Sequence, residues 1–179
     1  AFNTSEWEEI RLDIDKSVNP DVIGTMTDMS QIETGSVDAI YSSHNIEHLY
    51  PHEVGIALTE FHRVLTEDGF VMLTCPDLQS VCALVAEDKL LEAAYTSPAG
   101  PIAPIDMLYG FRPSMAAGNL YMSHRSGFTQ KTMIGTFKHF GFKSVAGSRR
   151  EAYFDLFCLA SKKELSEEEL VGLAKSHFP

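Results

Sequence analysis

The feature that most limits the fold is an alternation of short apolar runs with longer amphipathic segments in the middle of the chain. The runs 36–43 and 70–76 have the length and apolar content of buried strands. Between them, residues 52–69 place apolar side chains near helical spacing and end at Asp68-Gly69, which is typical of a helix C-terminus. Residues 78–95 predict a second helix. A strand–helix–strand–helix order favours a parallel sheet covered by helices on both faces.

The N-terminal part adds two shorter strand signals. Residues 8–15 alternate apolar and polar side chains, which predicts a strand, and residues 22–24 predict a short second one. The first is followed by a turn-forming stretch rich in Asn, Pro and Asp. We therefore expect the sheet to extend to this side.

The C-terminal part predicts a helix, a strand hairpin and a tail. A helix over 129–141 is expected to begin at Thr129 and end at Gly141, and residues 143–148 and 153–163 predict an antiparallel hairpin. Ser166 followed by Glu169 forms a capping box, the start of a surface helix. We expect one α/β domain over 1–163 and a helical tail over 164–179.

A long segment over residues 96–128 interrupts this alternation. It contains four glycines, four prolines and several aromatic, Arg and His side chains. A loop of this length in a compact domain is usually functional or disordered. Its aromatic, Arg and His side chains argue against disorder, so we interpret it as functional.

Composition excludes some partners. The 25 acidic residues outnumber the 14 basic ones, giving a net charge of −11 that repels nucleic acid. No apolar run approaches the roughly 18 residues that span a membrane. Cys75, Cys82 and Cys158 lie in apolar surroundings and are expected to be buried free thiols, which favours the cytoplasm.

The predicted strand ends carry the candidate binding residues. In open α/β sheets ligands bind at the carboxyl ends of the strands. Asp13, at the end of the first strand, is suited to accept two ribose hydroxyls, and Asp28 with Met29 offers an acceptor and an apolar wall for a purine. Read singly, Asp13 and Asp28 are equally explained as turn or cap residues.

The pentad His44-Asn45-Ile46-Glu47-His48 spells H-x-x-E-H, a pattern found in some zinc peptidases. In those enzymes it lies inside a long helix, whereas here it directly follows a predicted strand and Pro51 suits the first turn of the next helix. We expect no metal, His44 at a strand tip facing a ligand, and His48 as a hydrogen-bonding residue. A metal-dependent hydrolase using His44, Glu47 and His48 is the alternative.

Three stretches together resemble a known family. "RLDID" (11–15), "SSHNIEHL" (42–49) and "RVLTEDG" (63–69) are similar to the core of class I S-adenosylmethionine-dependent methyltransferases, above all to small predicted bacterial ones. The resemblance covers roughly residues 9–80. It implies a Rossmann-like, mostly parallel sheet with an antiparallel C-terminal hairpin. It also implies that ribose lies on Asp13, adenine on Asp28 and Met29, and the methionine portion on Ser43 and His44.

One family feature is missing. The family's first strand and its Gly-rich loop precede the position of Asp13, where this sequence has twelve residues and no glycine. We expect an N-terminally truncated domain with a missing or rearranged first strand, and weak or absent cofactor binding. A rearranged fold or a neighbouring chain could also fill the gap, and an unpaired strand edge beside it predicts a homodimer.

The resemblance implies methyl transfer to a small-molecule acceptor. Methyl transfer needs positioning and, for an alcohol or amine, removal of a proton. The candidate bases are His44, Asp77 and His124. The residues expected to line the acceptor pocket, or alternatively only to pack the loop, are Tyr109, Arg112, Tyr121 and Arg125. A second alternative is a non-catalytic binding or dimerisation module.

Overall fold

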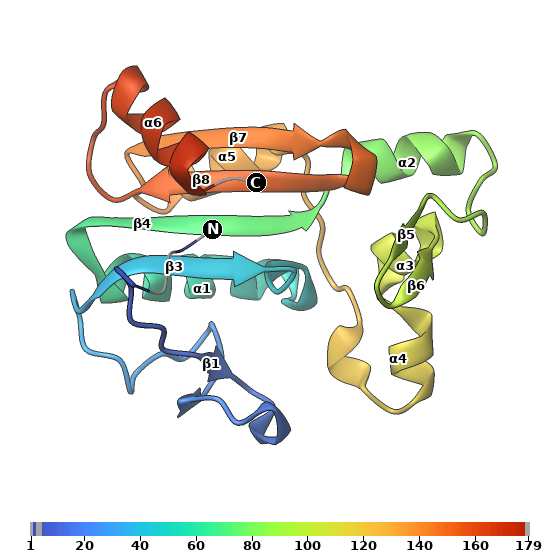
Figure 1. The fold of residues 1–179 in the computed structure, drawn as a ribbon, viewed down its shortest axis with the longest axis horizontal. Coiled ribbons are helices and arrows are strands. Elements are labelled where there is room, and N and C mark those ends of the chain that lie inside the picture. The colour runs from blue at the N-terminus through green and yellow to red at the C-terminus, as the bar shows by residue number, and fades with distance from the viewer. Residues whose placement is uncertain (1, 3–4, 178–179) are drawn as a thin grey trace.

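The computed structural model describes residues 2 and 5–177, and its centre is a four-stranded sheet (Figure 1). The strand order is β3 (Val37–Ser43), β4 (Leu65–Pro76), β8 (Asp155–Ser161) and β7 (Ser144–Arg150). β3 and β4 are parallel, whereas β8 is antiparallel to both of its neighbours. The α/β class and the antiparallel C-terminal hairpin are confirmed, although the parallel part of this sheet is only two strands wide.

Helices cover both faces of the sheet. α1 (Pro51–Val64) and α5 (Gln130–His139) lie on one face and bury Phe61 and Phe137 against it. α6 (Glu167–His177) lies on the other face, where Phe70 of β4 contacts the rings of Trp7 and His177. The predicted caps of α5 and α6 are present, because Thr129 accepts from the Thr132 N–H and Glu169 accepts from the Ser166 N–H. Of the predicted tail, residues 178 and 179 lie outside the described part.

The strand expected over 8–15 is much shorter than predicted. β1 (Leu12–Asp13) and β2 (Val22–Ile23) form a separate two-stranded parallel sheet, joined by the 3₁₀ helix η1 (Lys16–Val18). Among the described residues no strand pairs with the edge of β3 that faces away from β4. Among the described strands β1 pairs only with β2, which is itself two residues long. The described part of the chain has no longer neighbouring strand to pair with the rest of residues 8–15.

The predicted end of α1 at Asp68-Gly69 is wrong. The helix ends at Val64, and β4 begins at Leu65, which is fully buried and pairs with Val37. Phe70 pairs with Ala39, so residues 66–69 form an irregularity within the strand. The Gly69 carbonyl accepts from the Lys162 N–H at 3.1 Å, which places it in the sheet and not in a helix cap.

The segment expected to be a long loop has its own structure. After β4 come α2 (Leu78–Ala86), which is shorter than predicted, the hairpin β5 (Tyr95–Ser97) and β6 (Gly100–Ile102), α3 (Pro104–Tyr109), α4 (Arg112–Ala116) and the 3₁₀ helix η3 (Leu120–Met122). They surround a small core of Val81, Ile102 and Met107 and lie beyond the carboxyl end of β4 (Figure 1). Two further 3₁₀ turns, η2 (Ile46–His48) and η4 (Glu151–Tyr153), follow β3 and β7.

The cysteines are not all in the interior. Cys75 and Cys158 are buried free thiols, but Cys82 is exposed on α2. Its neighbours are apolar in sequence, yet the helix turns this position outward. No helix in the described part of the chain is both long and apolar enough to cross a membrane.

Candidate functional site

A cavity of about 1130 Å³ lies between the β1–β2 sheet and β3. Several predicted site residues line it: Asp13, Met29, His44, Tyr121 and Arg125. They come from the end of β1, the segment after β2, the end of β3 and the segment around η3. The fold therefore gathers five of the predicted residues around one space. Their binding roles stay predictions.

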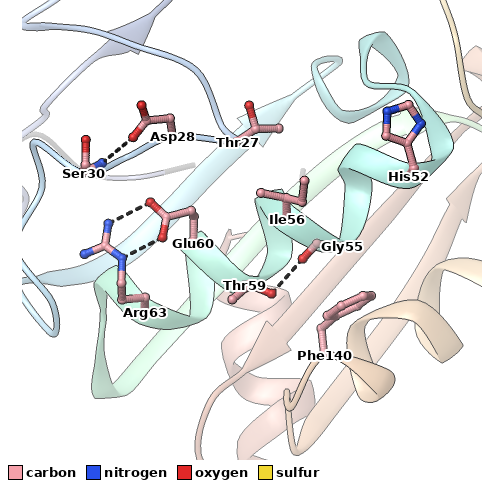
Figure 2. Close-up of a pocket in the computed structure, with 10 residues that line it drawn as sticks. All are labelled: Thr27, Asp28, Ser30, His52, Gly55, Ile56, Thr59, Glu60, Arg63 and Phe140. Carbon is pink, nitrogen blue, oxygen red and sulfur yellow. Dashed lines mark hydrogen bonds and ion pairs between the residues drawn. The ribbon is translucent and has the colours of Figure 1, made fainter.

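Asp28 and Ser43 do not line this cavity. Asp28 is exposed beside a shallow depression above α1 (Figure 2). There its carboxylate accepts from the Ser30 N–H at 3.1 Å, and hydrogen bonding to Ser30 lowers the pKa of Asp28. The Ser43 hydroxyl is hydrogen-bonded to the Thr74 hydroxyl at 2.9 Å.

An ion pair on α1 explains why Met29 and Asp28 separate. Glu60 and Arg63 pair at 2.7 Å (Figure 2), and together they hold both backbone groups of Met29. Glu60 accepts from the Met29 N–H and Arg63 donates to the Met29 carbonyl, each at 2.8 Å. With its backbone fixed in this way, Met29 turns its side chain into the core while Asp28 faces outward.

His44 lies between two buried carboxylates. Its Nδ1 is 3.3 Å from Glu47 Oε1 and its Nε2 is 3.6 Å from Asp155 Oδ2, and its φ of 52° is in the left-handed region. Burial alone would lower the pKa of His44, but the bonds to Asp155 and Glu47 outweigh it and raise the pKa to about 9. His44 is therefore an imidazolium at neutral pH and has no lone pair with which to accept a proton. This argues against its predicted role as a base.

The charge on His44 belongs to a longer chain of ion pairs. Asp155 is buried and pairs with Arg150 through bonds of 2.6 and 3.2 Å. Burial by itself would raise the pKa of Asp155, and the bonds from His44 and Arg150 reverse this and lower it. Neither Asp155 nor Arg150 is among the residues predicted from the sequence. The available signal was an acidic residue opening an otherwise apolar strand.

Two other predicted residues are engaged in structural contacts. Asp77 is buried at the start of α2, where it accepts from the Gln79 N–H and pairs with Arg149 at 2.9 Å. Arg112 forms a two-bond pair with buried Asp106, at 2.6 and 3.0 Å, and so closes α3 onto α4. Tyr109, in contrast, is 62% exposed and lies outside the large cavity's lining. None of the three is directed at the large cavity.

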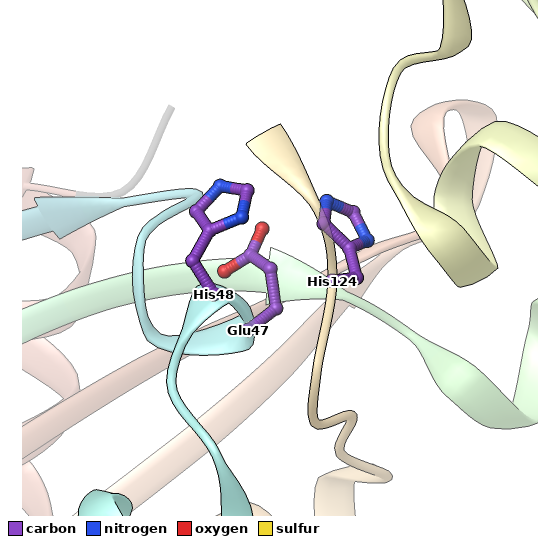
Figure 3. A group of neighbouring side chains, drawn as sticks. All are labelled: Glu47, His48 and His124. Atoms are coloured by element: carbon purple, nitrogen blue, oxygen red, sulfur yellow. The ribbon is translucent and has the colours of Figure 1, made fainter. Parts of the chain in front are cut away.

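His124 lies next to the pentad instead of on a free loop. It forms a group with Glu47 and His48 in which one ligand-type atom from each lies within 4.8 Å of the others (Figure 3). Burial lowers the pKa of His124, so its ring is neutral at pH 7. Arg125 stacks its guanidinium 4.7 Å above the Tyr50 ring. The structure thus brings His124 to Glu47 and His48, while His44 contacts Glu47 from the end of β3.

A mixed sheet with helices on both faces and a ligand-sized cavity beside its parallel strands is typical of Rossmann-like α/β domains. Residues 8–73 match the family model described as "Methyltransferase domain". The solved structures with similar folds include a protein of Pyrococcus horikoshii OT3, 15% identical, with 89% of this chain and 74% of that chain covered and a TM-score of 0.59. They also include a SAM-dependent methyltransferase from Archaeoglobus fulgidus, 12% identical, with 88% and 77% covered and a TM-score of 0.57. The family match thus covers the N-terminal half of the domain, and the similarity to these solved structures shows a methyltransferase-like α/β fold.

Several other solved structures with this fold are longer chains. An N1-methyltransferase from Burkholderia thailandensis, solved with S-adenosylhomocysteine, is 15% identical with a TM-score of 0.50, and 80% of this chain matches 50% of that one. Across three of the solved structures the chain spans only 32 to 62% of their length. No curated protein matches the sequence.

Proposed function

We propose that the domain binds S-adenosylmethionine in the large cavity and transfers its methyl group to a small-molecule acceptor. The observation that supports this most directly is that Asp13, Met29 and His44 line one cavity. The Asp13 carboxylate suits a ribose diol, and Met29 offers an apolar wall. His44, whose ring nitrogens face Glu47 and Asp155, would border the methionine portion.

The two ends of the cofactor fit unequally well. The nucleoside end meets Asp13 and an apolar wall that includes Leu12, Met26 and Met29. The amino-acid end would use a Gly-rich backbone loop, and residues 1–23 contain no glycine. We propose that residues 1–179 by themselves bind the cofactor weakly.

The proposal leaves one predicted base able to act. His44 is protonated and Asp77 is held by Arg149 and Gln79, whereas His124 is neutral and half-buried. The bound cofactor supplies an electrophilic methyl group, so the protein's part is to position the acceptor and remove its proton.

Calorimetric titration with S-adenosylhomocysteine tests the proposal. Asp13→Ala should weaken binding by about 10- to 100-fold, since a hydrogen bond to a charged group contributes roughly 1.5–3 kcal/mol. Asp28→Ala is the matched control, because it removes a nearby exposed carboxylate that does not line the cavity. Equal effects of the two substitutions, or no effect of Asp13→Ala, would refute the site.

The alternatives give different results in the same titration. A non-catalytic module would show no heat with S-adenosylmethionine or S-adenosylhomocysteine, and its melting temperature would not rise with either. A hydrolase built on His44, Glu47 and His48 is disfavoured, since His44 would have to give up its contacts with Glu47 and Asp155 and lies outside the group that could share an ion.

A further inference from the structure

The side chain of Glu47 is buried, with 1% of its surface exposed. Its Oε1 lies 3.3 Å from the His44 ring, whereas Oε2 accepts no hydrogen bond from the described residues. A buried polar atom without a hydrogen bond is costly. Oε2 therefore has room for a partner beyond the contact that His44 makes with Oε1.

Two histidines lie beside Glu47. His48 Nδ1 lies 3.1 Å from the Ser123 carbonyl, and His124 Nδ1 lies 2.8 Å from the Met107 carbonyl. A carbonyl oxygen can only accept, so both Nδ1 atoms carry the hydrogen and both Nε2 atoms keep a lone pair. The ring centroids are 5.0 Å apart (Figure 3).

This is how metal-binding histidines are normally held. A ligating imidazole donates its second N–H to a carbonyl or carboxylate, which fixes the tautomer and the ring orientation. Here both histidines have that support from the backbone, and the third member of the group is a carboxylate whose Oε2 accepts no hydrogen bond from the described residues.

We propose that Glu47, His48 and His124 bind one divalent transition-metal ion, with zinc as the best match. Two imidazoles and one carboxylate form a three-ligand set that leaves a fourth position for a small molecule. Ligand atoms of a tetrahedral zinc ion are about 3.4 Å apart, so side-chain rotations of about 1 Å complete the set from its present separation of up to 4.8 Å.

The surroundings have room for the ion and its ligand. A small cavity of about 20 Å³, lined by Glu47 and His124, is large enough for one water-sized group. His48 lines the large cavity on the other side. The metal would thus lie between residues that line the two spaces.

The fold keeps the two ligand segments together without the metal. The backbone N–H groups of Arg125 and Ser126 donate to the Glu47 carbonyl at 2.8 and 3.1 Å. The Ser126 hydroxyl donates to the Ile46 carbonyl at 3.3 Å. These bonds hold the segment bearing His124 against η2, so the site is largely preformed.

If the proposed function holds, the metal changes the role of His124. A Lewis acid lowers the pKa of a bound hydroxyl, so the acceptor could lose its proton without His124 acting as a base. Metal binding itself does not depend on the methyltransferase proposal, and the two can fail separately.

Titration of the chelator-treated full chain with Zn²⁺ tests the inference. We expect one ion per chain. Mutation of a residue that only supports a metal ligand typically lowers metal affinity about 10- to 100-fold. Loss of a ligand itself should cost more, so His48→Ala and His124→Ala should each weaken zinc binding by about 100-fold or more. Glu47→Gln keeps the volume of the side chain and should weaken binding without unfolding the chain.

His52→Ala is the matched control, because His52 lies on α1 and stacks on Tyr50, outside the group. Circular dichroism of each variant separates loss of the site from loss of the fold. Co²⁺ in place of Zn²⁺ should give visible absorption bands in the parent chain and His52→Ala only. Unchanged zinc affinity in His48→Ala and His124→Ala, or an equal loss in His52→Ala, would overturn the proposal. So would Zn²⁺ binding at an affinity unaffected by Glu47→Gln.

Discussion

Replacement of Gly110 by alanine should destabilise the domain and displace one ligand segment of the proposed metal site. Gly110 ends α3 with φ of 101° and ψ of 159°, a region that residues other than glycine rarely adopt. A Cβ at this position would also overlap the carbonyl oxygen of Met122, a backbone atom that cannot rotate away. Two residues after Met122 the chain reaches His124, whose backbone N–H donates to the Tyr109 carbonyl at 3.2 Å.

The size of the effect is the sum of these two costs. Backbone strain at such a position costs about 1–3 kcal/mol. The clash with Met122 adds a further ~1–3 kcal/mol, as forced overpacking does elsewhere. In a chain of this size each kcal/mol lowers the melting temperature by about 2–4 °C.

Gly118→Ala separates the two costs. Gly118 has φ of 99°, almost the same as Gly110, but a Cβ there would meet nothing within 4 Å. Urea unfolding of both variants should show Gly110→Ala to be less stable than Gly118→Ala by the cost of the clash. Zinc affinity should fall only in Gly110→Ala. Equal unfolding free energies for the two variants would refute the reasoning that Met122 needs the space.

Three further predictions concern the core, the loop after β2 and assembly. Phe137→Ala should lower the free energy of unfolding by about 3–5 kcal/mol, because its ring is fully buried against the sheet, and a loss under ~1 kcal/mol in urea unfolding would contradict this. Arg63→Met should cost about 1–3 kcal/mol and raise amide exchange over 29–34, since it removes the donor to the Met29 and Ile32 carbonyls; unchanged exchange there would count against that anchoring. We propose that the chain forms a homodimer through the edge of β3 that no described strand pairs with, and light scattering that gives the mass of one chain at high concentration would disprove it.

Local sequence patterns predicted the helices and strands whose position depends mainly on apolar periodicity and on signals at their ends. The strands β3 and β8 and the helix α5 follow apolar periodicity and end signals, and Thr129 and Glu169 make the capping bonds expected of them. The helix end predicted at Asp68-Gly69 was wrong because the same dipeptide is also compatible with an irregularity within a strand. Only the pairing of Leu65 with Val37 decides between the two.

The sequence predicted several residues of the candidate site, but it did not predict which of them lie close together. Their positions at strand ends and on the long segment singled out Asp13, His44 and His124. The same reasoning put Asp28 beside Asp13, although the Glu60–Arg63 pair on α1 turns Asp28 away. It also made His44 a base, because the sequence does not show that Asp155 comes to lie within 3.6 Å of the ring.

Patterns in the sequence were enough to predict the α/β class, the antiparallel end of the sheet and the presence of carboxylates and histidines at strand ends. These depend on periodicity and on residues close together in the chain. The charge of His44, the burial of Glu47 and the contact between His48 and His124 became visible only in the folded chain. Each of these depends on segments far apart in sequence that pack together, and burial and distance, which set both charge and metal affinity, exist only after that packing.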